Sequence, residues 1–162
     1  MKSMISLRPI TEDDFELTYE WENQEELWKV SEQTGPFSKV EIRSFLETCL
    51  DPRDLSIERL LICKEDEPIG AIDLLEYEPA IGHCNVGVFI VSPEHRRSGY
   101  AKTAMHQAIG DVKTRGFKMM KAIIYSDNEA SRRLFLALGF CQGGTLIYKS
   151  KPARLFFLEL TP

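Results

Sequence analysis

The sequence lacks the features of a membrane-spanning, disulfide-bonded or zinc-binding protein. Its apolar runs are all shorter than the ~20 residues that a helix needs to cross a bilayer. Its four cysteines form no C-x-x-C pair, have no histidine at metal-ligand spacing and follow no secretory leader. These absences predict no metal, no membrane contact, a cytoplasmic location and reduced, mostly buried thiols at Cys49, Cys63, Cys84 and Cys141.

An excess of basic residues is also absent. Lysine and arginine number 20 against 25 aspartates and glutamates, which gives a formal net charge of −5. This composition argues against nucleic acid as a partner, since a polyanion is held by clustered positive charge, and it permits a cationic ligand. The chain has no internal repeat or low-complexity tract. Its 162 residues, 43% of them hydrophobic, therefore predict one domain spanning residues 1–162.

What the chain does have is an alternation of strand and helix patterns. Short runs rich in Val, Ile, Leu and Phe predict strands, and apolar positions that recur at three and four residues predict helices. The residues expected to mark helix ends are Ser38 with Glu41, Gly116, Ser126 or Asp127, and Gly139. The expected order is β-α-α-β-β-β-α-β-α-β-β, with an antiparallel pair at the end. This is an α/β (α+β) fold rather than a doubly wound sheet.

The segment SPEHRRSGYAKTAM, residues 92–105, joins a Val-rich strand to the most regular of these helices. The first N–H groups of a helix have no partner within it and carry the positive end of its dipole, so a helix start is suited to an anion. Gly99 and Ala101 let a ligand approach the backbone, and three cations stand near them: Arg96, Arg97 and Lys102. The segment predicts a diphosphate cradle or, alternatively, a solvated basic turn. It is neither a Walker loop nor a G-x-G-x-x-G motif.

Two motifs in this order and spacing resemble the GCN5-related N-acetyltransferases, the GNAT family. Arg96-x-x-Gly99-x-Ala101 is similar to the family signature R/Q-x-x-G-x-G/A, and the later motif N-x-x-A/S-x-x-L-Y-x-x-x-G-F is matched by Asn128, Ser131, Leu134, Gly139 and Phe140. The similarity extends over nearly the whole chain. It implies a single domain with a mixed, mostly antiparallel sheet of about six or seven strands and about four helices, splayed between the two central parallel strands.

The resemblance also implies acetyl-CoA as the cofactor. The family holds the coenzyme A pyrophosphate in the loop before the helix, pairs the pantetheine arm with the preceding strand, and contacts the cofactor again at the later motif. The cofactor-binding residues implied for this chain are Phe89, Val91, Arg96, Arg97, Ser98, Gly99, Tyr100, Ala101, Lys102 and Asn128.

The acid–base residues common in the family are missing at their usual places. The tyrosine thought to protonate the leaving thiolate is Phe135 here, and strand glutamates of other members are replaced by Ile123 and Asn85. Direct attack of an amine on the thioester is still expected, because placement supplies much of the rate and a thiolate of pKa about 8–9 leaves without a strong acid. The candidate catalytic residues are Asn85, Glu76 and Asp73, although each also fits an ordinary solvent-facing strand residue.

The sequence indicates the acceptor amine less clearly than the cofactor. The segment WENQEELWKVSEQTGPFSKVEI, residues 21–42, combines aromatic and acidic side chains that suit a cationic amine, and it resembles polyamine and ribosomal-protein acetyltransferases. The substrate-binding candidates are Trp28, Glu32 and Tyr125. A small polyamine-like primary amine is favoured over a protein N-terminus, and a coenzyme A-binding sensor without catalysis is a further alternative. The edges of the last two strands offer a surface for a homodimer.

Overall fold

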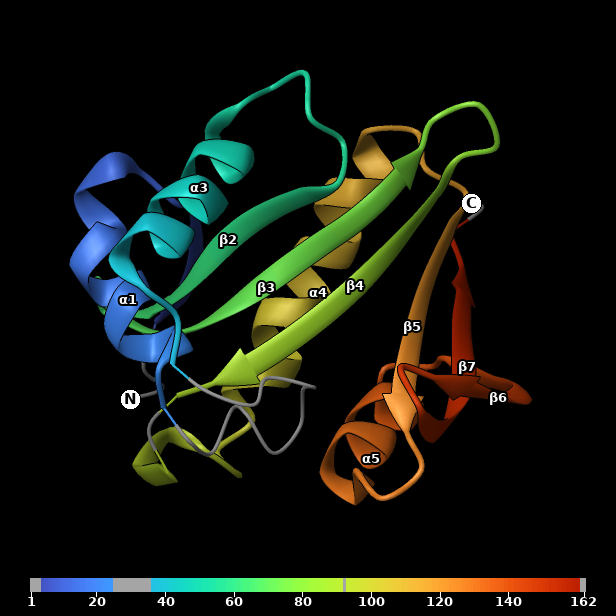
Figure 1. Ribbon diagram of the computed structural model, residues 1–162. Coiled ribbons are helices and arrows are strands. Elements are labelled where there is room, and N and C mark those ends of the chain that lie inside the picture. The colour runs from blue at the N-terminus through green and yellow to red at the C-terminus, as the bar shows by residue number, and fades with distance from the viewer. Residues whose placement is uncertain (1–3, 25–35, 92, 161–162) are drawn as a thin grey trace.

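The computed structural model describes residues 4–24, 36–91 and 93–160. These residues form one seven-stranded sheet in the order β1-β2-β3-β4-β5-β7-β6 (Figure 1). Neighbouring strands are antiparallel except β4 and β5, which are parallel. The strands are β1 (Ile5–Pro9), β2 (Ile57–Lys64), β3 (Glu67–Glu78), β4 (His83–Ile90), β5 (Met119–Tyr125), β6 (Cys141–Tyr148) and β7 (Lys151–Glu159).

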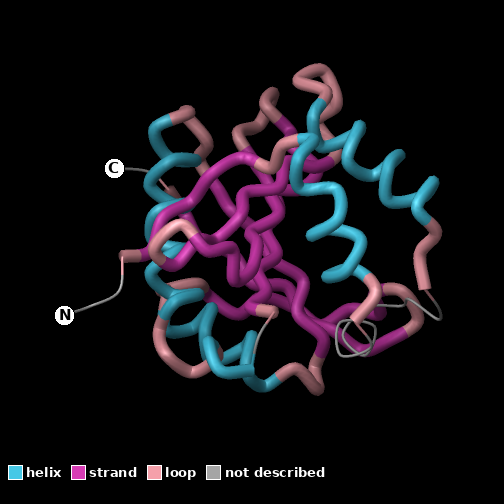
Figure 2. The backbone as a smooth tube through the Cα atoms, turned by 90° about the vertical axis from the view of Figure 1, so that its left-hand side faces the viewer, coloured by secondary structure: helices cyan, strands magenta, loops and turns pink. Residues whose placement is uncertain are grey.

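Helices lie on both faces of this sheet, as Figure 2 shows. In the described part of the chain they are α1 (Phe15–Glu22), α3 (Lys39–Leu50), α4 (Tyr100–Thr114) and α5 (Glu129–Ala137). α4 and α5 share a core with one face, to which Met105 and Phe135 belong, whereas α1 packs Trp21 against the other face. None of the described helices has the length and apolar character needed to span a membrane.

The capping signals read from the sequence act as expected at α3 and after α4. Ser38 Oγ accepts a hydrogen bond from Glu41 N at 3.1 Å, and Ser38 N donates to Glu41 Oε1 at 3.2 Å. Gly116 follows α4 with a φ of 91°, the left-handed conformation that glycine adopts without steric cost. These ends are set by residues close in sequence, which is why the pattern alone predicts them.

The start of α5 differs from the prediction. Asn128 is the N-cap residue, and its side chain accepts a hydrogen bond from Ser131 N at 3.2 Å, so neither Ser126 nor Asp127 takes that place. The reason lies in the preceding turn, where Asn128 N donates to the carbonyl oxygen of Tyr125 at 2.9 Å. Residues 126 and 127 form the turn that follows β5, and the helix begins only after them.

The thiols are less uniformly buried than the composition suggests. All four cysteines are free; Cys63 and Cys84 are buried and Cys49 is half-buried. Cys141 is exposed, because it begins β6, which forms one edge of the sheet. Cys141 is therefore the exception to the prediction of mostly buried thiols.

The two parallel strands separate soon after they meet. Three register pairs join β4 to β5, and the last of them is Asn85 with Lys121. Beyond this point β4 stays bonded to β3 and β5 stays bonded to β7, so each strand turns an unpaired edge toward the other. Figure 1 shows the ends of β4 and β5 apart, at the end of the molecule where α5 begins. The predicted α/β fold with a sheet splayed between its central parallel strands is confirmed.

Candidate active site

The loop predicted to hold a diphosphate lies between β4 and α4, at the end of the sheet where β4 and β5 separate (Figure 1). The chain reaches α4 through two residues of positive φ, Arg97 at 58° and Gly99 at 80°. Gly99 is the N-cap residue of α4, in a left-handed conformation that favours glycine. A Cβ placed on Gly99 meets no described atom within 4 Å. The start of α4 is therefore open to a ligand.

The start of α4 also lacks the side-chain cap that α3 and α5 have. Ser38 and Asn128 bond to first-turn amides of their helices, whereas Gly99 makes no side-chain bond to α4. Uncapped N–H groups at the positive end of a 15-residue helix are suited to an anion such as pyrophosphate. Ala101, half-buried, adds little bulk beside them.

The side chains of this loop point in different directions. Arg96 turns back onto β4, where its Nε donates to Ile90 O at 3.1 Å and its Nη2 donates to Val91 O at 2.9 Å. Arg96 therefore fixes the loop to the end of the strand. The ring of Tyr100 packs toward the core, with Lys64 Nζ 5.4 Å from the ring centroid. The side chains left exposed to meet a ligand are Arg97, Ser98 and Lys102.

Phe89 and Val91 lie on the face of the sheet that α1 covers. Val91 is buried beside Trp21, and the ring of Phe89 meets that of Trp21 edge-on, with the centroids 6.0 Å apart. What this end of β4 offers a ligand is thus its backbone, along an edge that has no β5 partner beyond Asn85. The predicted role of these two residues in binding the pantetheine arm stays a prediction.

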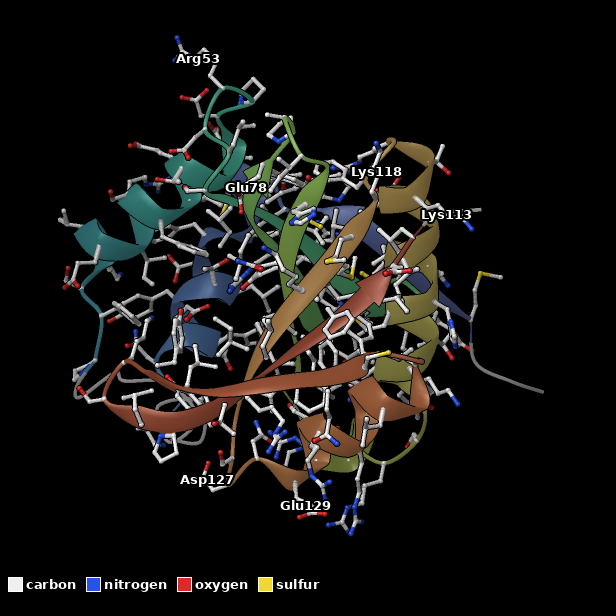
Figure 3. The ribbon with its side chains drawn as sticks, turned by 90° about the vertical axis from the view of Figure 1, so that its right-hand side faces the viewer. Arg53, Glu78, Lys113, Lys118, Asp127 and Glu129 are labelled. Carbon is white, nitrogen blue, oxygen red and sulfur yellow. The ribbon has the colours of Figure 1, made fainter. Side chains whose placement is uncertain are left out.

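Tyr125 and Asn128 lie on the opposite side of the opening, at the end of β5. The ring of Tyr125 is 6.1 Å from that of Tyr148, and Lys151 Nζ is 4.8 Å from the Tyr125 centroid. In Figure 3 the turn after β5, marked by Asp127 and Glu129, lies at the end of the molecule opposite Glu78 and Lys118. Tyr125 and Asn128 therefore belong to the same end as the Gly99 loop.

The remaining predicted residues are placed only in part. Asn85 is half-buried where β4 and β5 part. Trp28, Glu32 and the side chain of Glu76 lie outside what the structure describes, so their roles stay predictions. Phe135 is 2% exposed and packs edge-on against Phe140 at 4.8 Å, so this position of α5 holds a core ring and no proton donor.

Asp73 belongs to a buried ion-pair cluster that the sequence analysis did not find. Arg59 on β2 donates to both carboxylate oxygens of Asp73 at 2.7 and 2.8 Å, and to Glu22 of α1 at 2.6 Å. Its guanidinium also lies over the rings of Phe45 at 4.7 Å and Phe89 at 5.1 Å. Burial alone lowers the pKa of Arg59, but the two carboxylates outweigh burial and raise it. The cluster ties α1 and α3 to the three strands that lead to the opening.

Cys84 is not placed to act as a nucleophile. Burial raises its pKa to about 11, so at pH 8 roughly one thiol in a thousand is ionised. We expect iodoacetamide at pH 8 to label Cys141 within minutes and to leave Cys84 unmodified in the folded protein, as mass spectrometry of peptides will show. The Cys141→Ser variant should lose the fast label. Equal labelling rates at Cys84 and Cys141 would contradict this assignment.

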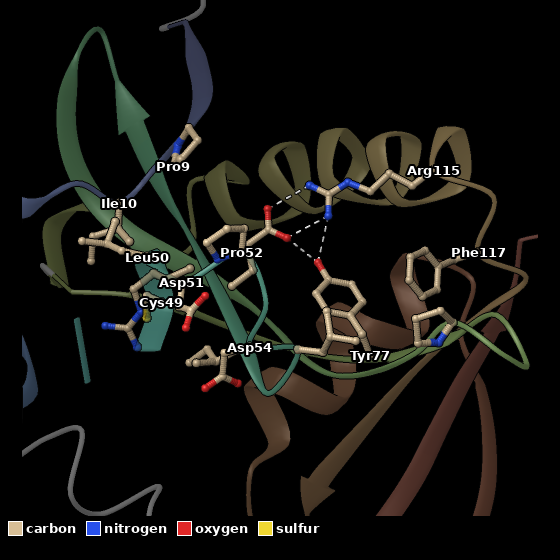
Figure 4. Close-up of a pocket in the computed structure, with 15 residues that line it drawn as sticks. Pro9, Ile10, Cys49, Leu50, Asp51, Pro52, Asp54, Tyr77, Arg115 and Phe117 are labelled. Atoms are coloured by element: carbon tan, nitrogen blue, oxygen red, sulfur yellow. Dashed lines mark hydrogen bonds and ion pairs between the residues drawn. The ribbon is translucent and has the colours of Figure 1, made fainter. Parts of the chain in front are cut away.

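A separate cleft of about 490 Å³ lies beside the C-terminal end of α4 (Figure 4). Arg115 in its wall is at the C-terminal end of α4, about 24 Å along the helix from Gly99 at 1.5 Å per residue. Arg115 donates to both carboxylate oxygens of Glu58 at 2.7 and 2.8 Å and lowers the pKa of Glu58. The other charged residues that line the cleft are likewise bonded within the protein: Asp51, Asp54 and Arg59. Its lining includes no residue of β4, of β5 or of the loop before α4, although Arg59 in its wall also bonds to Asp73.

Comparison with known proteins decides the family. Residues 5–141 match the family model described as an acetyltransferase (GNAT) domain. The chain belongs to the GNAT acetyltransferase family. This confirms the resemblance read from the two sequence motifs. A Bacillus subtilis relative, the uncharacterized N-acetyltransferase YoaA, is 32% identical over 81 residues, which cover 49% of this chain and 45% of that protein. The aligned part is thus less than half of the relative's length.

Solved structures share the GNAT fold over nearly the whole chain. Spermidine N-acetyltransferase from Vibrio cholerae, in complex with CoA and spermine, has a TM-score of 0.86 at 16% identity, covering 96% of this chain and 95% of that one. The ribosomal L7/L12 α-N-protein acetyltransferase in complex with coenzyme A has a TM-score of 0.84 at 15% identity, covering 98% and 95%. At these identities the likeness shows the fold alone.

Proposed function

We propose that this GNAT protein is an acetyl-CoA-dependent N-acetyltransferase that moves an acetyl group directly to a primary amine. The observation that carries the proposal is the uncapped start of α4, with left-handed Gly99 at its tip, beside the unpaired edges of β4 and β5. Backbone N–H groups there suit the pyrophosphate, and Arg97 and Lys102 add positive charge. The edge of β4 suits a pantetheine arm paired as an added strand.

The reaction needs little acid–base catalysis from the protein's side chains. The bound cofactor supplies a thioester, and overall a protonated amine and acetyl-CoA give an N-acetyl amide, free coenzyme A thiol and one proton; the C–N bond forms as the C–S bond breaks. The chain's residues then have to bind, orient and exclude water, since placement is worth several kcal/mol of the barrier. The buried phenyl ring of Phe135 fits a reaction in which the leaving thiolate departs without a strong acid.

For the acceptor we propose a polyamine-like small amine, with a protein N-terminus as the second candidate. The likeness in fold to the spermidine enzyme and to the ribosomal-protein enzyme is nearly equal, with TM-scores of 0.86 and 0.84, so it does not choose between them. The net charge of −5 favours the more cationic acceptor. The proposal extends to a cytoplasmic location, which four free cysteines suit, and to a homodimer formed through the exposed edge strand β6.

The decisive experiment measures release of coenzyme A thiol from acetyl-CoA with a panel of amines: spermidine, putrescine, an aminoglycoside and a peptide with a free N-terminus. We expect steady turnover with at least one of them and a rise in Tm on adding coenzyme A, because a ligand of the native state stabilises it. A rise in Tm without turnover on any amine would identify a binding module instead. No rise in Tm would contradict the cofactor assignment itself.

A further inference from the structure

The ion-pair cluster lies in a row of residues that crosses the sheet and ends at the opening. Arg59 on β2 stands opposite Asp73 on β3, and Asp73 stands opposite Gly87 on β4. Residues directly opposite in neighbouring antiparallel strands share a face, with Cβ positions about 4.5–5.5 Å apart. Gly87 lies two positions beyond Asn85, the last β4 residue paired with β5. The row therefore runs from the buried guanidinium to the unpaired edge of β4.

Nothing in the backbone or the packing of the described residues requires glycine at position 87. Its φ is not positive, unlike that of Gly99, and a Cβ placed on it meets no described atom within 4 Å. Gly70 on the neighbouring strand shows the contrast, since a Cβ there would lie 2.1 Å from Phe89 O. The missing side chain at Gly87 leaves room on the face of β4, directly beside Asp73.

Asp73 is the carboxylate of this row that stands beside Gly87. Its side chain is 17% exposed, and it is bonded to Arg59. Each carboxylate oxygen accepts more than one hydrogen bond, so Asp73 keeps acceptor capacity while bound to Arg59. Lys121, opposite Asn85 on β5, has its own carboxylate partner in Glu78 at 3.8 Å. A carboxylate with remaining acceptor capacity, opposite a residue that has no side chain, therefore suits a cationic ligand.

We propose that the ammonium group of the acceptor binds over Gly87 with Asp73 as its anionic partner, and that Arg59 is a positioning residue that holds Asp73 and Glu22 in place. This inference rests on the proposed function. A nitrogen held there lies beside the β4 edge that suits the pantetheine arm. Once the ammonium has lost a proton to water, its lone pair reaches the thioester carbon from the face that α1 and α3 cover. The substrate class is an alkyl amine that is cationic before the reaction, and Gly87 sets the width of the space it enters.

The first test compares Gly87→Val with Gly144→Val, using the most active amine of the panel. Gly144 is a strand glycine of β6 whose added Cβ also meets no described atom within 4 Å. We expect Gly87→Val to raise the KM for the amine at least tenfold. Its KM for acetyl-CoA and the rise in Tm with coenzyme A should stay within twofold of the wild-type values. Gly144→Val should change none of the three.

The second test is Asp73→Asn, which keeps the size of the side chain and one carbonyl oxygen for Arg59 but removes the charge. We expect at least a tenfold rise in KM for an alkyl amine and a smaller rise for an aromatic amine that is neutral at the assay pH. If Asp73→Asn does not fold, Gly87→Val still decides, because it leaves every ion pair in place.

The outcomes separate the inference from the proposed function. Wild-type KM values for the amine in both variants, in a protein that turns over, overturn the acceptor site and leave the function standing. A wild-type protein that binds coenzyme A but releases no thiol with any amine overturns the function. In that case spermidine is titrated calorimetrically into the coenzyme A-saturated protein. Binding that Gly87→Val and Asp73→Asn weaken supports the site, and no binding, or unchanged binding, overturns it.

Discussion

Replacing Arg59 with methionine is expected to lower the free energy of unfolding by about 3–5 kcal/mol, because two carboxylates then lose the cation that compensates them. The Arg59 side chain is 4% exposed, and it is bonded to Asp73 and Glu22 at distances of 2.6 to 2.8 Å. Methionine keeps an unbranched apolar side chain at this position but has none of the five N–H donors. A loss of this size lowers the Tm of a chain of this length by roughly 10 °C, which calorimetry measures directly.

Two further variants show whether buried charge is the cause. Arg53→Met removes an arginine that is 88% exposed and bonded to nearby Asp51, so we expect a change within about 0.5 kcal/mol. The triple variant Glu22→Leu, Arg59→Met, Asp73→Leu removes all three charges of the cluster and should regain most of the stability. It should still bind the acceptor amine poorly if Asp73 is the ammonium partner. An Arg59→Met protein as stable as Arg53→Met would contradict the cluster's structural role.

The parts of the fold that the sequence predicts are those set by neighbouring residues. The capping box of Ser38 and Glu41 and the left-handed Gly116 act within one turn, so their consequences are visible in a short window. The sequence pattern predicts a start of α5 that is one or two residues too early. Ser126, Asp127 and Asn128 can each cap a helix, and the pattern does not choose among them. The hydrogen bond from Asn128 N to Tyr125 O makes Asn128 the cap. That bond depends on where β5 ends, which a cap pattern does not contain.

The Arg59 cluster shows why the sequence pattern does not reveal the proposed acceptor-binding residues. Lys64 pairs with Glu67 across the turn between β2 and β3. If the residues of the two strands were matched one to one from that pair outward, Glu58 would lie opposite Asp73. A register shift between Ile62 and Cys63 moves the pairing by one residue and brings Arg59 there instead. The third member, Glu22, is 37 residues upstream in another element. In the sequence the cluster is marked by an arginine in an otherwise apolar strand. Such an arginine is expected to face solvent unless the register of the sheet is known.

The same difference separates the cofactor from the acceptor. The proposed cofactor contacts come largely from one contiguous segment, Arg96 to Lys102, whose work is done by backbone N–H groups and a glycine. A short motif can therefore record them. The proposed acceptor site is assembled from single residues on α1, β2, β3 and β4, brought together by sheet register. Residues gathered in this way leave no contiguous pattern in the sequence.

Replacing Gly99 with valine is expected to remove the stabilisation by coenzyme A. At a ligand concentration of 100 times Kd, the wild-type protein should gain about 2.7 kcal/mol, roughly 5–10 °C in Tm. A valine at φ 80° costs about 1–2 kcal/mol in backbone strain, and its side chain occupies the open space before the first-turn amides of α4. We therefore expect a modestly less stable protein whose Tm no longer responds to coenzyme A, as thermal melting with and without the ligand will show.

Gly116→Val is the matched control for the strain. Gly116 follows the other end of α4 with a φ of 91°, and a Cβ there also meets no described atom within 4 Å, so the backbone cost is comparable. This variant should lose a similar amount of stability and keep the full rise in Tm with coenzyme A. The difference between the two variants isolates the loop from the general effect of a left-handed valine. A wild-type rise in Tm for Gly99→Val would show that the start of α4 does not hold the cofactor.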